Sequence, residues 1–191
     1  MNITSFLIYC FIVTFTPGPT NIVILSTVNQ FGTRKAMHYT YGATLAFGLL
    51  LFLSAILNSV LVTVLPKILV LLQIMGSLYM VYLAYQIYKS DSSKKSSQLN
   101  GTFLSGFFMQ FLNPKVIIFT LTVIPSFVMK NYTESTVILI FVAVITIIGF
   151  LAFIGWVLFG TIFKRFLQKH TKVVNILMAA FLLYAACMIW I

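Results

Sequence analysis

The chain has 191 residues, of which 61% are hydrophobic and only 7% are charged. Soluble domains carry roughly a quarter charged residues, so a chain this apolar cannot cover a surface that faces water. The formal net charge of +10 does not indicate a nucleic-acid partner, because the basic residues lie in loops between apolar runs and form no single basic surface. We therefore expect the lipid bilayer to be the main solvent of this protein.

Six continuous apolar runs follow one another along the chain. A helix needs about 20 residues to cross a bilayer, and each run reaches or nearly reaches that length. Membrane β-strands would instead alternate apolar and polar residues over shorter segments. The sequence therefore predicts an all-α membrane protein with six transmembrane helices, at residues 3–28, 38–64, 68–88, 103–128, 135–162 and 172–191.

The first run contains Thr16-Pro17-Gly18-Pro19 near its middle. Proline removes backbone hydrogen bonds that hydrocarbon cannot replace, so a helix broken here must face protein or a wet cavity. The run has no basic segment before it and no obvious cleavage site after it. We therefore interpret it as a retained span and not as a signal peptide.

Small and aromatic residues characterise the second and third runs. Gly42 and Ala46, together with Gly149 of the fifth run, predict close helix packing. The third run carries tyrosines spaced three apart, which form a stripe on one helical face. Bundle packing and the membrane interface explain most such residues, and one or two of them could face a cavity. The stripe consists of Tyr79, Tyr82, Tyr85 and Tyr88.

A polar stretch from Lys89 to Asn100 lies near the midpoint of the chain, and its composition predicts a flexible cytoplasmic linker. We expect one transporter domain over residues 1–191, with a first half at about 1–88, the linker at about 89–102 and a second half at about 103–191. Three helices on each side of the linker would give the two halves opposite orientations. The sequence thus favours two inverted three-helix repeats.

The fourth run carries Asn113-Pro114-Lys115, a second proline break at a corresponding depth. Matched breaks in two halves are typical of transporter binding sites near the bilayer midplane, whereas a single break would more simply be an ordinary proline kink. Lys115 is the one charge placed deep within a predicted span, since Asp91 and Glu134 lie in polar connections. Its candidate partners are backbone carbonyls left free by the breaks, water, or an anionic group of a substrate. Alternatively, its side chain could extend so that the ammonium reaches the membrane interface.

The candidate substrate-binding residues lie at the two breaks and on the adjoining helical faces. Each polar side chain could instead make an interhelical hydrogen bond. The candidates are Thr16, Pro17, Gly18, Pro19, Asn21, Gln110, Asn113, Pro114 and Lys115, with Thr14 and Asn175 as further polar residues.

The absence of acids from the spans restricts the substrate. A dicationic substrate would find no negative side chain in the spans to balance its second positive charge. A small zwitterion could place its carboxylate at Lys115 or at the start of a half-helix. Its ammonium group could bind the backbone carbonyls that the breaks leave free. If transport is coupled to protons, Lys115 is the candidate coupling group, because burial disfavours a charged lysine. Cys10 and Cys187 have no metal or redox spacing, so we expect packing roles for them and no cofactor.

Loop charges predict the orientation of the chain. Lys and Arg accumulate in cytoplasmic loops, and the first, third and fifth loops hold far more of them than the second and fourth. We therefore expect these three loops in the cytoplasm and both termini outside. The basic residues are Arg34, Lys35, Lys89, Lys94, Lys95, Lys164, Arg165, Lys169 and Lys172 on one side, against Lys67 and Lys130 on the other.

Four motifs, together with the segment Val174–Tyr184, resemble the LysE/RhtB amino-acid exporter family over nearly the whole chain. They are Phe15–Asn21, Phe31–Lys35, Gly76–Tyr82 and Gly106–Lys115. The resemblance implies a bacterial inner-membrane exporter of amino acids or close derivatives that uses the proton gradient. The segment Val174–Tyr184 is similar to the branch that exports cysteine and O-acetylserine. Members usually carry Asn directly after Pro-Gly-Pro, whereas this chain has Thr20 and then Asn21, which bears on the substrate more than on the fold.

We accordingly expect a secondary exporter of small neutral amino acids that works by alternating access. A passive channel with the same breaks in its filter is the alternative. A membrane enzyme is disfavoured, since the spans hold no acid, metal cluster or nucleophile–base spacing. The sequence leaves the oligomeric state open, a homo-oligomer included.

Overall fold

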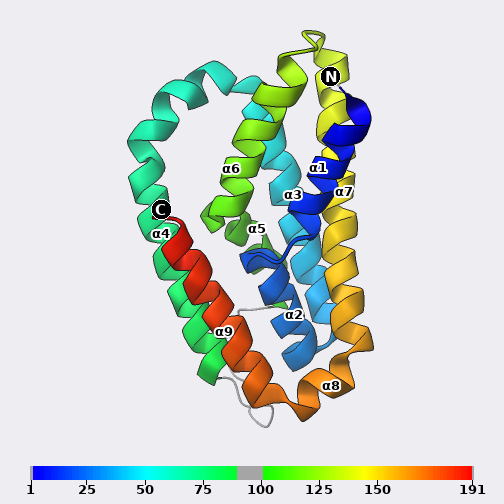
Figure 1. Ribbon diagram of the computed structural model, residues 1–191, viewed down its shortest axis with the longest axis vertical. Coiled ribbons are helices and arrows are strands. Elements are labelled where there is room, and N and C mark those ends of the chain that lie inside the picture. The colour runs from blue at the N-terminus through cyan, green and yellow to red at the C-terminus, as the bar shows by residue number, and fades with distance from the viewer. Residues whose placement is uncertain (1, 90–100, 191) are drawn as a thin grey trace.

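The computed structural model describes residues 2–89 and 101–190, and of residues 58–69 the backbone alone. The described chain is helical and contains no strand. Figure 1 shows the helices running along one long axis. The elements are α1 (Ile3–Phe15), α2 (Pro19–Phe31), α3 (Thr33–Ile56), α4 (Asn58–Lys89), α5 (Phe103–Leu112), α6 (Pro114–Val123), the π-helical segment η2 (Ile124–Met129), α7 (Ser135–Ile162), α8 (Lys164–Lys169) and α9 (Thr171–Met188).

Both predicted proline breaks are present. The helices α1 and α2 meet at an angle of 48° around Pro17, and α5 meets the continuous α6–η2 segment at 68° around Asn113. Four other helices are long and apolar enough to cross a membrane: α3, residues Val70–Lys89 of α4, α7 and α9. The described chain therefore has four candidate spans, or six if each bent pair is one span.

The predicted boundary between the second and third spans is wrong. We expected a loop at Pro66-Lys67, but α3 ends at Ile56 and α4 continues from Asn58 through Pro66. A proline inside a membrane helix removes one backbone hydrogen bond without having to end the helix. The second span also begins earlier than predicted, directly after Gly32, whose positive φ of 87° makes the turn out of α2. Residues 90–100 of the predicted linker lie outside the described residues.

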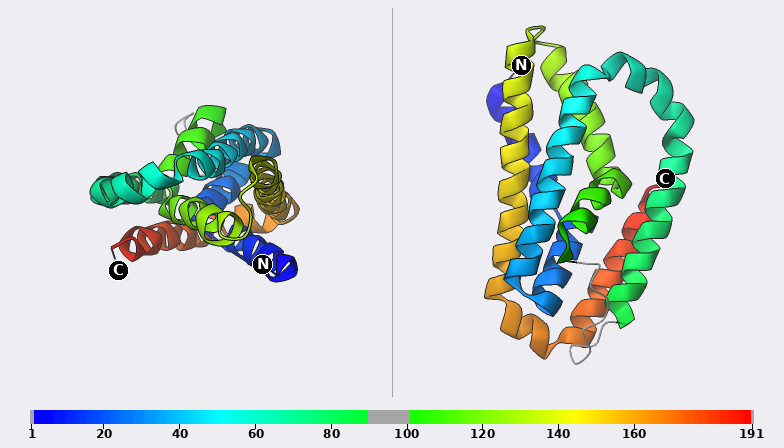
Figure 2. Two further views of the ribbon diagram at one scale, coloured as in Figure 1. Left: turned by 90° about the horizontal axis from the view of Figure 1, so that it is seen from above. Right: turned by 180° about the vertical axis from the view of Figure 1, so that it is seen from behind.

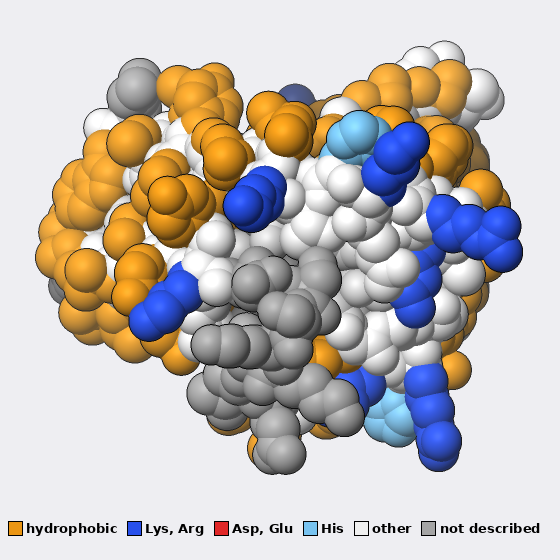
Figure 3. Space-filling view, turned by 90° about the horizontal axis from the view of Figure 1, so that it is seen from below, with side chains coloured by type: hydrophobic (Ala, Val, Ile, Leu, Met, Phe, Trp, Pro, Cys, Tyr) orange, Lys and Arg blue, Asp and Glu red, His pale blue; other side chains and the backbone are white. Residues whose placement is uncertain are grey.

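The loops alternate between the two ends of the bundle. The α2–α3 turn and α8 lie at the lower end, while the N-terminus and the connection from η2 to α7 lie at the upper end (Figure 1). Lys and Arg side chains are spread over the lower end, and no acidic side chain is visible on its described part (Figure 3). The C-terminus lies at mid-height, because α9 has only 18 residues.

The half-helix α2 lies in the interior of the bundle, where α3, α7 and α9 contact it (Figure 2). All eleven of its residues from Pro19 to Asn29 are buried. Several of these buried residues are polar, which is unusual for a segment with no exposed face. They are tolerated here because α2 is surrounded by protein and not by lipid. The helix therefore forms the axis around which the remaining elements pack.

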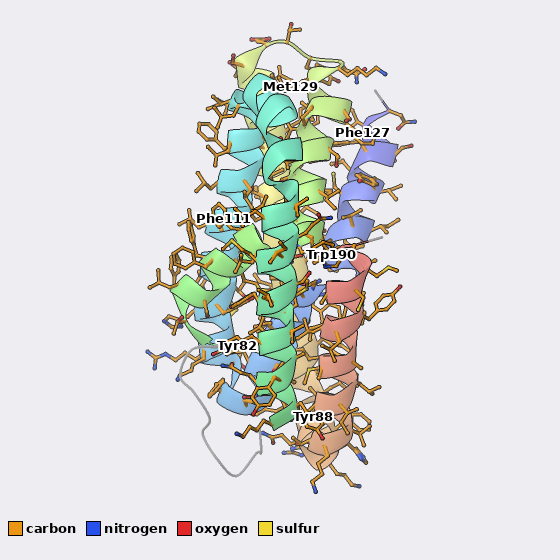
Figure 4. The ribbon with its side chains drawn as sticks, turned by 90° about the vertical axis from the view of Figure 1, so that its left-hand side faces the viewer. Tyr82, Tyr88, Phe111, Phe127, Met129 and Trp190 are labelled. Atoms are coloured by element: carbon orange, nitrogen blue, oxygen red, sulfur yellow. The ribbon has the colours of Figure 1, made fainter. Side chains whose placement is uncertain are left out.

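The helix α9 packs against the lower part of α4 (Figure 1). The Gln73 side chain donates to the Ile189 carbonyl at 2.7 Å, and the Trp190 indole donates to the Ser77 hydroxyl at 2.9 Å. These bonds hold the end of α9 against α4, where Figure 4 shows Trp190.

Of the tyrosine stripe on α4, Tyr79 is partly buried and packs against the core. The other three are exposed, and Figure 4 shows Tyr82 and Tyr88 in the half of α4 nearest the basic end. The stripe therefore turns one tyrosine toward the core, and interfacial positions suit the others.

The helices α3 and α5 cross closely through two glycines. A Cβ added to Gly42 would collide with the Phe103 carbonyl oxygen, and one added to Gly106 would collide with the Tyr39 carbonyl oxygen. Backbone atoms cannot move aside as a side-chain tip can. This confirms the close packing that Gly42 predicts.

Gly42→Ala is expected to destabilise the fold by about 1–3 kcal/mol, the usual cost of forcing an extra methyl group into a packed crossing. Thermal unfolding of the detergent-solubilised protein measures the change. Gly48→Ala is the matched control on the same helix, because its added Cβ meets only the Thr146 side chain, at 3.1 Å. Equal unfolding temperatures for Gly42→Ala and the wild-type protein would contradict this account of the α3–α5 crossing.

Candidate functional site

The two helix breaks meet at mid-height in the bundle (Figure 1). The Lys115 ammonium, in the first turn of α6, donates to both the carbonyl and the hydroxyl of Thr16 at 2.8 Å each, and lies 3.5 Å from the Pro17 carbonyl. None of these acceptors is a carboxylate. These bonds of Lys115 link the first half of the chain to the second.

The carbonyls freed by the first break all find donors. An α-helix leaves its last carbonyls without intrahelical partners, and hydrocarbon would leave them unsatisfied. Here side chains take over. The donors are the Thr16 hydroxyl to Val13 (2.9 Å), the Asn21 amide to Thr14 (3.3 Å) and Thr16 (2.9 Å), the Trp156 indole to Phe15 (3.1 Å), and the Lys115 ammonium to Thr16 and Pro17.

The second break is held by Asn113, which is the N-cap of α6. Its side-chain oxygen accepts a hydrogen bond from the backbone N–H of Lys115 at 3.1 Å. Its amide donates to the Thr20 hydroxyl at 2.8 Å, and that hydroxyl donates to the Gln110 side-chain oxygen at 3.3 Å. One buried chain of polar groups thus crosses from α5 and α6 to the start of α2.

A small amphipathic cavity of about 30 Å³ lies beside these breaks. Gly18, Thr20, Asn21, Asn113 and Lys115 line its polar side, together with Thr14. Its apolar side is formed by Val13, Phe47, Val116, Phe119 and Phe153. The buried Asn21 side-chain oxygen has no hydrogen-bond partner within the described part of the chain, so the cavity is bordered by an acceptor that a ligand could use.

A second cavity of about 240 Å³ also has Gly18 and Lys115 in its lining. It is more open than the first, and residues of α9 such as Phe181 and Tyr184 complete its wall. Lys115 therefore lines two cavities of different size.

The structure brings most of the predicted site residues together. Gly18, Asn21, Asn113 and Lys115 line the first cavity, and Pro17, Pro19 and Pro114 line the second. Thr16 binds Lys115, and Gln110 is connected through Thr20. Asn175 is buried in α9 and is not among the residues that line the first cavity.

Sequence reasoning missed several residues of the site. Thr20 was noticed only as a departure from the usual motif, although it joins the two breaks. The indole of Trp156 and the three phenylalanines of the first cavity were not singled out, because aromatic residues inside an apolar run carry no signal of their own. Cys10 and Cys187 are both free thiols.

Broken helices that meet in the middle of an apolar bundle are the hallmark of a membrane translocator. The family model described as LysE type translocator matches residues 11–191, so the chain belongs to that family. This confirms the resemblance seen in the motifs. The chain is accordingly a multi-pass membrane transporter and not an enzyme.

Curated relatives are similar over almost their whole length. A cysteine/O-acetylserine efflux protein of Klebsiella pneumoniae is 30% identical over 185 residues, which cover 96% of this chain and 94% of the relative. A protein of the same name from Escherichia coli strain K12 is 29% identical over 189 residues, or 98% of this chain and 97% of the relative. No solved structure matches the chain at a significant level.

Proposed function

We propose that this protein exports small neutral amino acids or their derivatives, of the cysteine and O-acetylserine kind, across a bacterial inner membrane. The observation that carries the proposal is the bond from Lys115 to Thr16, which joins the two broken helices over an amphipathic cavity. The names of the relatives support the substrate class. Six spans arranged as two inverted halves, with the basic loops in the cytoplasm and both termini outside, are part of the proposal.

The polar side of the cavity offers partners for both charges of a zwitterion. Gly18 is the N-cap of α2 and the helix has no side-chain cap. Its first residue, Pro19, has no N–H, so we propose that the backbone N–H groups of Thr20 and Asn21 face a carboxylate, as helix N-termini commonly do. Lys115 adds a positive charge beside them. The unpartnered oxygen of Asn21 and the carbonyls that Lys115 now occupies are acceptors for an ammonium group.

Transport requires the closed arrangement to open. A cavity of about 30 Å³ holds roughly two water molecules, which is too little for an amino acid. We propose that the substrate carboxylate replaces Thr16 as the partner of Lys115, so that the two halves separate and re-form around the substrate in alternating access. Lys115 is also the residue we propose to carry the coupled proton, because the site contains no carboxylate among its lining residues.

Counterflow in proteoliposomes tests this function. With cysteine, O-acetylserine, threonine, leucine and lysine as substrates, we expect saturable exchange of cysteine and O-acetylserine and background rates for lysine, whose second positive charge would find no carboxylate among the residues that line the cavity. Imposing a proton gradient should accelerate net efflux. Lysine exchange at the rate of cysteine would overturn the substrate assignment, and a non-saturating conductance would favour the passive channel instead.

A further inference from the structure

One wall of the small cavity is made of three phenylalanine rings from three different helices. Phe47 of α3 lies 6.0 Å from Phe119 of α6 between ring centroids, nearly parallel at 13°, and 6.3 Å from Phe153 of α7 at 70°. Each of the three is at least 95% buried. Phe47 is the shared member of both pairs, so its position sets the position of the wall.

Gly149 of α7 lies directly against the ring of Phe47. A Cβ added at Gly149 would lie 2.5 Å from the Phe47 Cε1 and 2.7 Å from its Cδ1, which is far inside van der Waals contact. Phe119 and Phe153 flank the same ring, and all three rings line the small cavity. A side chain at residue 149 would therefore displace the Phe47 ring, and we expect the displaced ring to take space from the cavity.

The polar residues that line the cavity all lie at or next to the two helix breaks. A zwitterion that binds there with its charged groups must turn its side chain toward the aromatic wall. Such a wall favours small uncharged groups: a thiol gains sulfur–aromatic contact, whereas a charged side chain would lose its hydration without a partner.

We propose that Phe47, held in place by Gly149, is the residue that sets the size and polarity of the substrate side chain. This inference rests on the proposed function and extends it from the backbone of the substrate to its side chain. Phe47 touches the substrate, and Gly149 is a positioning residue that acts through Phe47.

Ratios of transport rates test the proposal, because a ratio does not depend on how much protein is reconstituted. In Phe47→Ala the rate for leucine relative to cysteine should rise about tenfold, the scale on which a methylene-sized change in an apolar pocket acts. In Gly149→Ala the rate for O-acetylserine relative to cysteine should fall by about the same factor, since the larger substrate loses space first. If Phe47→Ala does not fold, Phe47→Leu provides the same readout.

Gly48→Ala is the matched control, because it adds the same methyl group to the same α3–α7 interface but meets Thr146 and not a cavity ring. Its rate ratios should equal those of the wild-type protein. A wild-type protein that carries neither cysteine nor O-acetylserine would refute the proposed function itself. A wild-type protein that carries both, with unchanged ratios in the Phe47 and Gly149 variants, would overturn the role of the aromatic wall alone.

Discussion

Lys115→Met should reduce the initial rate of cysteine efflux by about 10- to 100-fold, which corresponds to the loss of a hydrogen bond to a charged group. The ammonium makes two bonds of 2.8 Å to Thr16 and is the candidate partner of the substrate carboxylate. Methionine keeps a similar length and apolar stem, so packing around residue 115 is largely retained. The rate is measured in proteoliposomes per mole of reconstituted protein.

Lys130→Met is the matched control, since it removes an exposed lysine from the connection at the upper end of the bundle. It should insert and export like the wild-type protein. Thr16→Val separates the two contacts of Lys115, because it deletes the hydroxyl acceptor and leaves the carbonyl; its rate should fall between those of Lys115→Met and the wild-type protein. Wild-type efflux by a correctly inserted Lys115→Met protein would refute the proposed site.

Replacing both Pro17 and Pro19 by alanine should abolish efflux while membrane insertion persists. Without these prolines, residues 16–19 can adopt helical geometry and α1 can join α2. The carbonyls before the break would then bind backbone N–H groups and would be lost to Lys115, Asn21 and Trp156. A shift of about an ångström at a preorganised site costs about 100-fold in rate, and joining the helices would move the site by at least that much.

The control for the double variant is Pro125→Ala, which removes a proline from η2, outside both cavities. It should retain efflux. Circular dichroism of the purified proteins shows whether helix content is preserved in all variants. Efflux by the Pro17/Pro19 double variant at the rate of Pro125→Ala would mean that the first break is an ordinary kink.

The helix breaks and the charge between them could be predicted from the sequence because prolines and charges are rare inside apolar runs. Lys115 stands out for the same reason, and its pairing with freed carbonyls was one of the partners expected for it. The aromatic wall could not be predicted in this way. The chain has 19 phenylalanines, so a phenylalanine that lines a cavity looks like one that faces lipid until α3, α6 and α7 are placed side by side.

Pro66 shows the opposite error, in which a local signal was given too much weight. The predicted spans 38–64 and 68–88 left Pro66 and Lys67 in a loop, but α4 continues past them, because a membrane helix tolerates the loss of one backbone bond. At Pro17 and Pro114 the open backbone is stabilised by partners across the bundle, such as Lys115 and Asn113. Only the three-dimensional arrangement distinguishes these two uses of proline.

The complete enclosure of α2 also has a consequence for how the protein is made. This segment carries Thr20, Asn21, Ser26, Thr27 and Asn29, and polar residues lower the tendency of a nascent helix to leave the translocon for lipid. The helices that shelter it, α3, α7 and α9, are all synthesised after it. The centre of the transporter is thus synthesised before the helices that shelter it, and it reaches its final surroundings only when α9 has arrived.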